Sequence, residues 1–403
     1  MSAPRRAGLV GALLGVAAAG VAAGLATERF AVGRARNRVA DPYADESFGR
    51  MPCDAEFTVS GQDGVDLHVE VVEPAEGEPE LTVVFVHGFA LDMGTWHFQR
   101  RALGAVPKPR VRAVFYDQPG HGRSGRKPSG DYSIDELGED LAAVIAQVAP
   151  AGPLVLAGHS MGGMTIMALA EHHPELFESR VVGIALVSTS AGDLDAVALG
   201  LPGPVADLVG RIRRPLTPAF AAALRARPGL LEKGRAAGSD LAYLLTRRYG
   251  FGGADVSPSL VRYVEQMNSA TPLDVVAGYL RTLSDHERYA ALEVFDGIES
   301  LLIGGEDDLL TPIEHTEEMA RLLPGAEYVE IADGGHVTLM EHADVVNAHL
   351  LAFLQRAARA LPGERAPETP RRRQARAERA EKADEAGSTE RRRLRRVRRR
   401  KSA

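Results

Sequence analysis

Ser160 stands in a setting that suits a nucleophile. It lies within Gly158-His159-Ser160-Met161-Gly162, directly after an apolar run and directly before a stretch of helical composition. A serine hydroxyl is a weak nucleophile at neutral pH, so it needs exposure and a base beside it. A sharp strand-to-helix turn provides that exposure, and Gly158 and Gly162 leave room there for the neighbouring backbone. The string therefore predicts nucleophilic catalysis by Ser160.

A base and an orienting acid are available farther along the chain. His336 follows two glycines, between the last expected strand and the last expected helix. Asp308 lies between another strand and helix, with Asp307 in reserve, and a carboxylate there could stabilise the imidazolium. The alternatives are a surface histidine in a glycine turn and an acidic turn that caps a helix. The order Ser160, Asp308, His336 is that of one hydrolase class, and it favours a triad.

Acyl transfer by serine also needs two backbone N–H donors for the oxyanion. Met161 begins the helix that follows Ser160, where the helix dipole favours negative charge. The second donor is expected from the loop after His87 and Gly88, at Phe89. We expect His87 to form a local hydrogen bond that shapes this loop and to take no part in the reaction.

The elements that must carry these residues alternate along the chain. Apolar runs typical of buried parallel strands occupy residues 81–87, 111–117, 154–157, 181–188, 301–303 and 328–331. Residues 56–60 and 65–72 resemble a strand pair, and helical spacing is found in 134–148, 312–323 and 337–360. This alternation predicts the α/β class, with a parallel sheet covered on both faces.

One long segment, residues 191–296, interrupts the alternation. It holds several helix-like stretches separated by prolines and no clear strand. We interpret it as a helical cap inserted between two strands, at the edge of the sheet where loops build sites. Residues 211–248 of this segment are rich in arginine. They form either a solvated surface or a contact with anionic lipid.

Together these strings resemble the α/β-hydrolase superfamily. The matching strings are residues 86–89, 117–124, 158–163, 305–308 and 334–336, within a resemblance that runs from about residue 56 to 360. The resemblance implies an eight-stranded, mostly parallel sheet with helices on both faces, a helical cap over the site, and no cofactor. It gives Asp117 and Ser124 a role in shaping the loop after the fourth strand. The core is expected in residues 53–190 and 297–362. Serine at the nucleophile position argues against the dehalogenase and epoxide hydrolase branches.

The N-terminal residues 1–52 differ from this core. Residues 7–27 are Ala, Gly, Leu and Val with a single Thr, and arginines flank them on both sides. A helix that crosses a bilayer needs about 20 residues. We therefore expect an uncleaved, single-pass membrane anchor followed by a linker. The alternative is a cleaved signal peptide, which would make the protein secreted.

The C-terminal residues 363–403 are strongly basic. From residue 364 onward 16 Lys or Arg face 7 Asp or Glu, while the whole chain has a formal net charge of −7. The rest of the chain is therefore acidic, which argues against nucleic-acid binding by the body. We expect a disordered tail that contacts phosphates of lipid or RNA or keeps the protein soluble. With an anchor present, lipid is preferred, and this favours a cytoplasmic catalytic domain.

Metal chemistry finds little support in the sequence. Cys53 is the single cysteine, so an internal disulfide and a cysteine-rich metal site are both excluded. The neighbouring residues His172 and His173 lack a recognised metal-binding spacing. We expect no metal site.

The residues favour a serine hydrolase that cleaves small-molecule carboxylic esters with an apolar or lipid-like part through an acyl-enzyme. A cofactor-free perhydrolase or haloperoxidase-like enzyme, or a thioesterase, could use the same triad. A non-enzymatic receptor on this scaffold would not need all of Ser160, Asp308 and His336.

Overall fold

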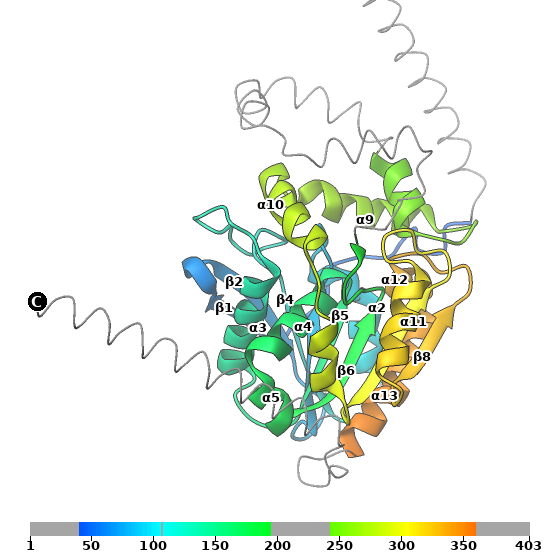
Figure 1. The fold of residues 1–403 in the computed structure, drawn as a ribbon. Helices are drawn as coiled ribbons and strands as arrows, with labels where there is room; N and C mark the ends of the chain where they lie inside the picture. The colour runs from blue at the N-terminus through cyan, green and yellow to red at the C-terminus, as the bar shows by residue number, and fades with distance from the viewer. Residues whose placement is uncertain (1–39, 106–107, 195–241, 360–403) are drawn as a thin grey trace, which may run out of the picture.

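One eight-stranded sheet runs through the protein, with the strand order β1-β2-β4-β3-β5-β6-β7-β8. The computed structural model describes residues 40–105, 108–194 and 242–359 (Figure 1). The expected anchor at 7–27, most of the arginine-rich part of the cap and the basic tail lie outside these residues. β2 pairs antiparallel with β1 and β4, and the other neighbours are parallel. The predicted eight-stranded, mostly parallel sheet is therefore confirmed.

The strands match the apolar runs of the sequence closely. Their bounds are Ala55–Ser60 (β1), Asp66–Val72 (β2), Leu81–Val86 (β3), Val111–Tyr116 (β4), Leu154–His159 (β5), Val181–Val187 (β6), Glu299–Gly305 (β7) and Glu327–Ile331 (β8). All residues of β3, β5 and β6 are buried, as continuous apolar strands between two helical layers should be.

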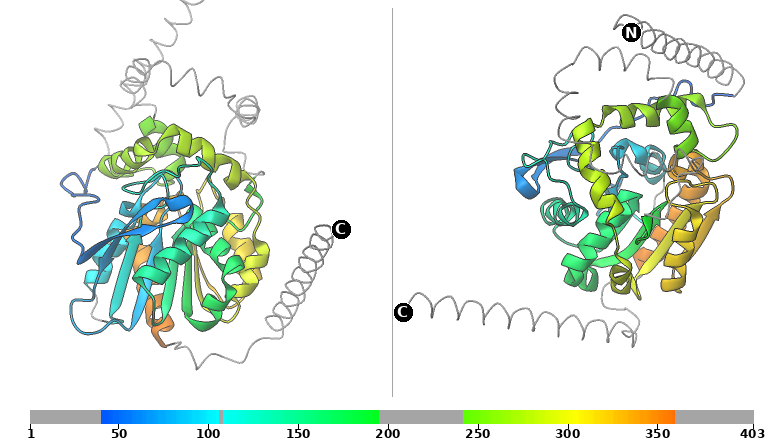
Figure 2. Two further views of the ribbon diagram at one scale, coloured as in Figure 1. Left: turned by 90° about the vertical axis from the view of Figure 1, so that its left-hand side faces the viewer. Right: turned by 45° about the horizontal axis from the view of Figure 1, so that its top comes forward.

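Helices cover both faces of the sheet (Figure 2). The core of one face holds side chains from α2 (His97–Gly104) and α13 (Ala343–Arg359). The core of the other face includes α3 (Ile134–Val148), α4 (Met161–His172), α5 (Pro174–Ser179) and α11 (Ile313–Leu322). α3 begins where the sequence predicts, because Ser133 accepts a hydrogen bond from the N–H of Glu136 and caps the helix.

The closing helix expected over 337–360 is not continuous. It consists of α12 (Thr338–Glu341) and α13, with His342 between them at φ −117° and ψ 45°. Thr338, Leu339 and Met340 are buried, so the short helix turns its side chains into the core before the chain changes direction. Helical spacing continues through this break, and the sequence pattern alone does not reveal it.

The described part of the predicted cap consists of helical residues 242–250, α9 (Pro258–Ala270), α10 (Leu273–Ser284) and the 3-10 helix η4 (Tyr289–Phe295). The first three lie together at the top of Figure 1, over one end of the sheet. η4 differs, because Leu292 and Phe295 pack into the core of the sheet beside Phe177 of α5. The boundaries of the cap remain a prediction.

Residues 40–52 form a strap of successive turns that packs against two helices. Asp41 accepts hydrogen bonds from Ser257, just before α9, and from Ser259 in its first turn. Phe48 stacks on Tyr263 of α9, with ring centroids 4.7 Å apart. Glu46 pairs with His97 of α2 at 2.9 Å. The strap therefore joins the core helix α2 to the cap helix α9.

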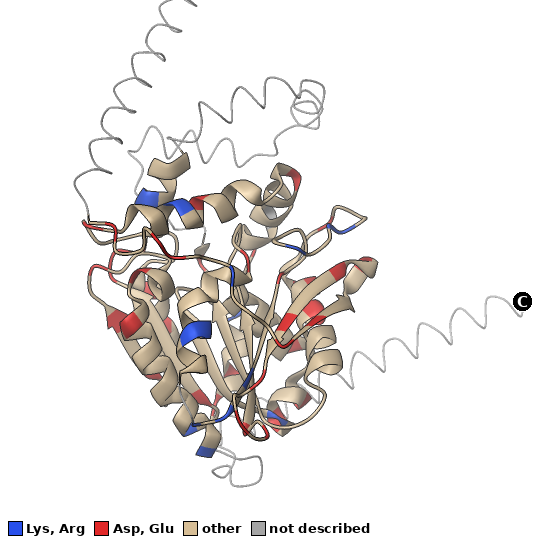
Figure 3. Cartoon of the chain, turned by 180° about the vertical axis from the view of Figure 1, so that it is seen from behind, with Lys and Arg blue, Asp and Glu red and all other residues tan. Residues whose placement is uncertain are grey.

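Charged positions are spread over the described part of the chain, with both signs interspersed (Figure 3). Within that part, no helix is both long enough and apolar enough to cross a membrane.

Candidate active site

Ser160 occupies the turn between β5 and α4. Its backbone has φ 52° and ψ −119°, a conformation that costs energy in a residue with a Cβ and that the surrounding structure must hold. A Cβ on Gly158 would lie 2.6 Å from the backbone of Gly162, and one on Gly162 would collide with the carbonyl oxygen of Val86. The two glycines therefore permit the turn. The hydroxyl of Thr189 donates to the carbonyl of Ser160 at 2.7 Å and fixes it.

The three side chains singled out by the sequence meet at this turn. His336 Nε2 lies 2.9 Å from Ser160 Oγ, and His336 Nδ1 lies 2.8 Å from Asp308 Oδ2. With the proton assigned to Nδ1, His336 donates to the carboxylate and Nε2 accepts from the serine hydroxyl. All three residues are buried, and Ser160 retains 9% of its exposure. The serine hydroxyl therefore lies beside a base and remains slightly exposed.

Hydrogen bonds from the following residues of its own loop fix the orientation of the Asp308 carboxylate. Its Oδ1 accepts from the N–H groups of Leu310 and Thr311 at 2.8 and 2.9 Å, and its Oδ2 accepts from the Thr311 hydroxyl at 2.8 Å. These donors orient the carboxylate toward His336. The reserve candidate, Asp307, is exposed, and its N–H donates to the carbonyl of Gly334. Of the two aspartates, Asp308 is the one that contacts the imidazole.

His159 supports the loop that carries His336, a role that the sequence did not reveal. Its Nε2–H donates to the carbonyl of His336 at 2.9 Å. Burial lowers the pKa of His159 to about 3, so the ring stays neutral and the hydrogen bond persists through the working pH range. Glu341 holds the same loop from the other side by accepting the N–H of Gly335 at 2.8 Å.

The two predicted oxyanion donors come from separate elements. Met161 is the first residue of α4, where N–H groups lack acceptors within the helix. Phe89 lies in the loop after β3. The next N–H in that loop, that of Ala90, donates to His121 Nε2 at 3.1 Å, and that of Leu91 donates to the carbonyl of Gly88. Within the described chain, no hydrogen bond occupies the N–H of Phe89.

Two buried histidines and a glutamine hold the loop after β3 in place. His87 Nδ1 donates to the carbonyl of Gly88 at 2.8 Å, and its Nε2 accepts from the N–H of Gln118. Burial lowers the pKa of His87 well below its usual value and that of His121 to about 4, so both rings are neutral. The side chain of Gln118 donates to the carbonyl of His87 at 2.7 Å and accepts from Thr165 of α4 at 2.9 Å.

No local pattern in the sequence indicates the roles of Gln118, His121 and Thr165. The first two lie inside the string 117–124, in which the resemblance implies a role for Asp117 and Ser124 only. Asp117 accepts from the N–H groups of Met93 and Arg123 at 2.8 Å each, which shapes the loop as the resemblance implies.

An apolar wall adjoins the nucleophile. Met161 and Met164 of α4 pack with Tyr132 and with Val275 and Tyr279 of α10, and Phe89 is partly buried against them. This cluster joins the nucleophile helix to the cap helix. The side chains of Met161, Val275 and Tyr279 are completely buried, so the surroundings of the nucleophile helix on this side are apolar.

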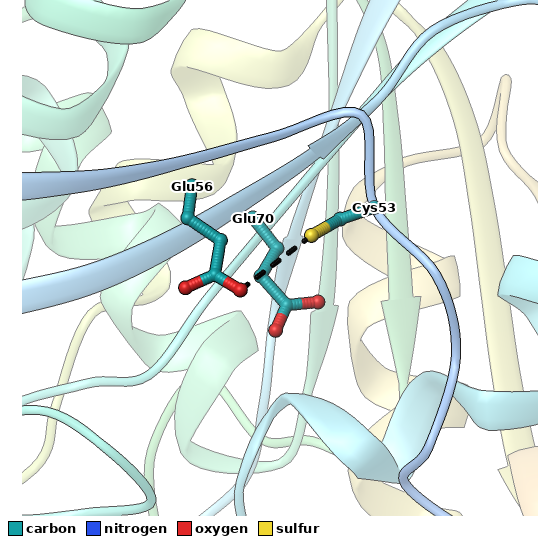
Figure 4. A group of neighbouring side chains, drawn as sticks. All are labelled: Cys53, Glu56 and Glu70. Carbon is teal, nitrogen blue, oxygen red and sulfur yellow. Dashed lines mark hydrogen bonds between the residues drawn. The ribbon is translucent and has the colours of Figure 1, made fainter.

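One group outside this site has the donor types of a metal centre. Cys53, Glu56 and Glu70 bring a sulfur and two carboxylates within 4.8 Å of one another (Figure 4). Arginines already pair with both carboxylates, because Arg123 contacts Glu56 and Glu70, and Arg100 contacts Glu70 at 2.6 Å. Burial, and next the negative charge of Glu70 and Glu56, raise the pKa of the thiol, which disfavours the thiolate that a metal needs. We assign no metal to this group.

A serine, an imidazole, a carboxylate and two backbone N–H groups at one edge of a parallel sheet are the parts needed for acyl transfer. The chain belongs to the α/β hydrolase fold family, whose sequence profile matches residues 82–343.

Similar proteins span several activities. A dihydrolipoyllysine-residue acetyltransferase component of the acetoin cleaving system from Pseudomonas putida is 30% identical over 70% of this chain, and the chain spans 65% of that protein's length. An sn-1-specific diacylglycerol lipase from Mus musculus is 28% identical over 69% of this chain and 83% of the lipase. A thermophilic esterase from Thermogutta terrifontis shares the fold, with a TM-score of 0.54, 24% identity and coverage of 75% of this chain and 98% of the esterase.

Proposed function

We propose that this protein is a serine hydrolase that cleaves carboxylic esters with an apolar acyl or alcohol part. The observation that carries the proposal is the continuous contact from Ser160 Oγ through His336 to Asp308, at 2.9 and 2.8 Å. The apolar wall of α4 and α10 beside the nucleophile supports an apolar substrate. The similarity to a diacylglycerol lipase is consistent with such a substrate.

The proposed reaction has two acyl-transfer steps. Ser160 Oγ attacks the ester carbonyl carbon while His336 Nε2 takes the hydroxyl proton, and Asp308 stabilises the resulting imidazolium. The N–H groups of Phe89 and Met161 would receive the oxyanion. The tetrahedral intermediate then expels the alcohol, which takes the proton from Nε2, and leaves an acyl-enzyme. Water attacks this acyl group by the same route, releases the carboxylic acid and restores Ser160.

A fluorophosphonate probe tests the nucleophile, because it phosphonylates only an activated serine. We expect labelling of the wild type and none of Ser160→Ala. Ser190→Ala is a matched control, since the Ser190 hydroxyl also lies 2.9 Å from an imidazole nitrogen, that of His315, but is fully buried. It should remain labelled. Labelling that persists in Ser160→Ala would contradict the assignment.

Turnover of p-nitrophenyl esters of increasing chain length tests the reaction. We expect Ser160-dependent hydrolysis, and loss of roughly 10⁶-fold in kcat for Ser160→Ala. Folded protein that is labelled at Ser160 but hydrolyses no ester or thioester would contradict ester hydrolysis. If it then forms peracid from hydrogen peroxide and a carboxylic acid, the perhydrolase alternative is correct.

A further inference from the structure

Helix α10 is apolar on two opposite faces. Val275 and Tyr279 point inward and are completely buried in the wall beside the nucleophile. Leu273, Ala277 and Leu280 lie at spacings of four and three residues, which places them on one outer stripe of the helix. Leu273 is 61% exposed and Leu280 is 50% exposed. A helix that is apolar on both sides is ordinarily buried on both sides.

The outer stripe has an energetic reason to be covered. Moving a leucine side chain from water into apolar surroundings is favourable. Single exposed leucines are common on proteins, but two on one helix stripe, separated by an exposed alanine, form a small continuous apolar strip. Among the described residues, Leu245 in the cap helix 242–250 is a third exposed leucine, at 48%.

The strap brings the N-terminal part of the chain to this side. Asp41 contacts Ser257 and Ser259 at the beginning of α9, and Phe48 stacks on Tyr263 in the same helix. The described chain therefore begins against the cap, as the dark blue trace in Figure 2 shows. Residue 40 therefore lies near the beginning of α9, and α10 follows that helix in the chain.

The apolar residues 7–27 lie a short distance upstream. They are long enough to cross the roughly 30 Å hydrocarbon core of a bilayer, which needs about 20 residues. Residues 28–39 join them to the strap, and even fully extended they span only about 40 Å at ~3.3–3.6 Å per residue. A bilayer that held residues 7–27 would thus lie within reach of the cap.

We propose that the outer stripe of α10 docks on the surface of a phospholipid bilayer that also holds residues 7–27. Docking by this face places α10 between the bilayer and Ser160, so the nucleophile lies behind a single helix, which is about 10–12 Å across. The substrates of the proposed hydrolase would then be membrane lipids with long acyl chains. This last part rests on the proposed function, whereas docking itself does not.

An environment-sensitive label on the full-length chain tests docking. The single cysteine is first replaced by Cys53→Ser, and an NBD fluorophore is attached to Ala277→Cys or, as a matched control, to Val345→Cys. Val345 is 43% exposed and lies in α13, a helix that covers the sheet and is not part of the cap. In phosphatidylcholine proteoliposomes we expect a blue shift and quenching by doxyl lipids at position 277 and neither at 345.

Three outcomes would overturn docking. Equal emission at 277 and 345 in vesicles would show that the stripe stays in water. A label at 277 that is already blue-shifted without lipid would show that the chain's own residues, such as 195–241, cover the stripe. A lipid-independent shift that grows with protein concentration would show that a second copy covers it.

Activity supplies the second measurement. Leu273→Gln with Leu280→Gln should lower hydrolysis of diacylglycerol in vesicles by about tenfold or more, as expected from the loss of two apolar contacts. Turnover of soluble p-nitrophenyl butyrate should not change, and Val345→Gln should change neither rate. Equal loss on both substrates would contradict the proposal. If the wild type hydrolyses no ester, the proposed function fails, while the label still decides docking.

Discussion

Gln118 connects the two segments that present the oxyanion donors. Its amide nitrogen donates to the carbonyl of His87, two residues before Phe89, and its oxygen accepts from Thr165, one turn after Met161. Gln118 is completely buried, so neither bond competes with water. The side chain therefore acts as a spacer that sets the separation of the two N–H groups.

Replacing this spacer should impair catalysis more than binding. For Gln118→Leu we expect kcat to fall by roughly 10- to 100-fold with little change in KM, because oxyanion donors act on the transition state. Thr165→Val, which removes one of the two bonds, should have a smaller effect in the same direction. Steady-state kinetics with p-nitrophenyl esters measure both.

Gln99→Leu is the matched control for this prediction. Gln99 is also completely buried, and its amide donates to the carbonyl of Leu339 and to Asn347 on the other face of the sheet. We expect it to lower stability without a comparable fall in kcat. Equal effects of the two substitutions on kcat would show that Gln118 is only part of the core.

The sequence reveals the reacting groups more readily than their supports. Ser160, Asp308 and His336 each stand in a local string with a recognisable strand or helix beside it. The hydrogen bonds of Gln118 and His159 join residues 31 to 177 positions apart. Such partners depend on how loops from different strands meet, and no local pattern encodes that.

At the scale of elements, the turn between β5 and α4 depends on close backbone contact. Gly162→Ala should destabilise the protein by roughly 1–3 kcal/mol or more, because its Cβ would overlap the carbonyl oxygen of Val86. The displacement of α4 should also reduce labelling of Ser160. Urea denaturation followed by circular dichroism measures the first effect, and the fluorophosphonate rate measures the second.

Gly104→Ala serves as the control at the end of α2, where nothing lies within 4 Å of an added Cβ. It should leave labelling unchanged and keep or slightly raise stability. If Gly162→Ala is tolerated as well as Gly104→Ala, the close packing of the turn is not required.

The elements themselves are largely predictable from apolar runs and helical spacing, and all eight strands begin within two residues of their predicted start. The break at His342 and the strap were not predictable. The break follows from packing of buried residues in α12, and the strap follows from contacts of Asp41 and Phe48 with a helix more than 200 residues away. Neither leaves a periodic signal.

For the whole molecule, buried neutral histidines couple folding to pH. Burial lowers the pKa of His121 and His286 to about 4 and that of His159 to about 3, from a usual value of 6.5. Because the pKa of each imidazole is lower in the folded protein, these histidines bind protons in the unfolded chain at pH values where they stay neutral in the folded protein. Stability is therefore complete above pH 6.5 and is lost as pH falls from 6.5 toward 4.

His286→Gln should weaken this dependence. The substitution can keep a hydrogen bond to the carbonyl of Ser190, which His286 Nε2 makes at 3.1 Å, while it removes one titrating group. Near pH 5 each such histidine contributes a slope of roughly 1 kcal/mol per pH unit to the free energy of unfolding. Urea denaturation at pH 7, 6 and 5 should show a shallower loss in the variant. An unchanged slope would contradict a neutral buried His286.

Whole-molecule organisation is where the sequence informs least. Composition separates an apolar N-terminal run, an acidic body and a basic tail, and these stay predictions. How α10 lies over the nucleophile depends on contacts such as those of Val275 and Tyr279 with Met161, which spacing along the chain does not encode.

The most direct test of the account is to trap the acyl-enzyme. The wild-type protein is mixed with excess p-nitrophenyl butyrate and quenched in acid within the first turnover, and its intact mass and peptides are then measured. The account predicts a burst of p-nitrophenol close to one per protein and a butyryl group on the peptide that holds Ser160. Ester hydrolysis without an acyl group on Ser160, or with the group on another residue, would contradict it.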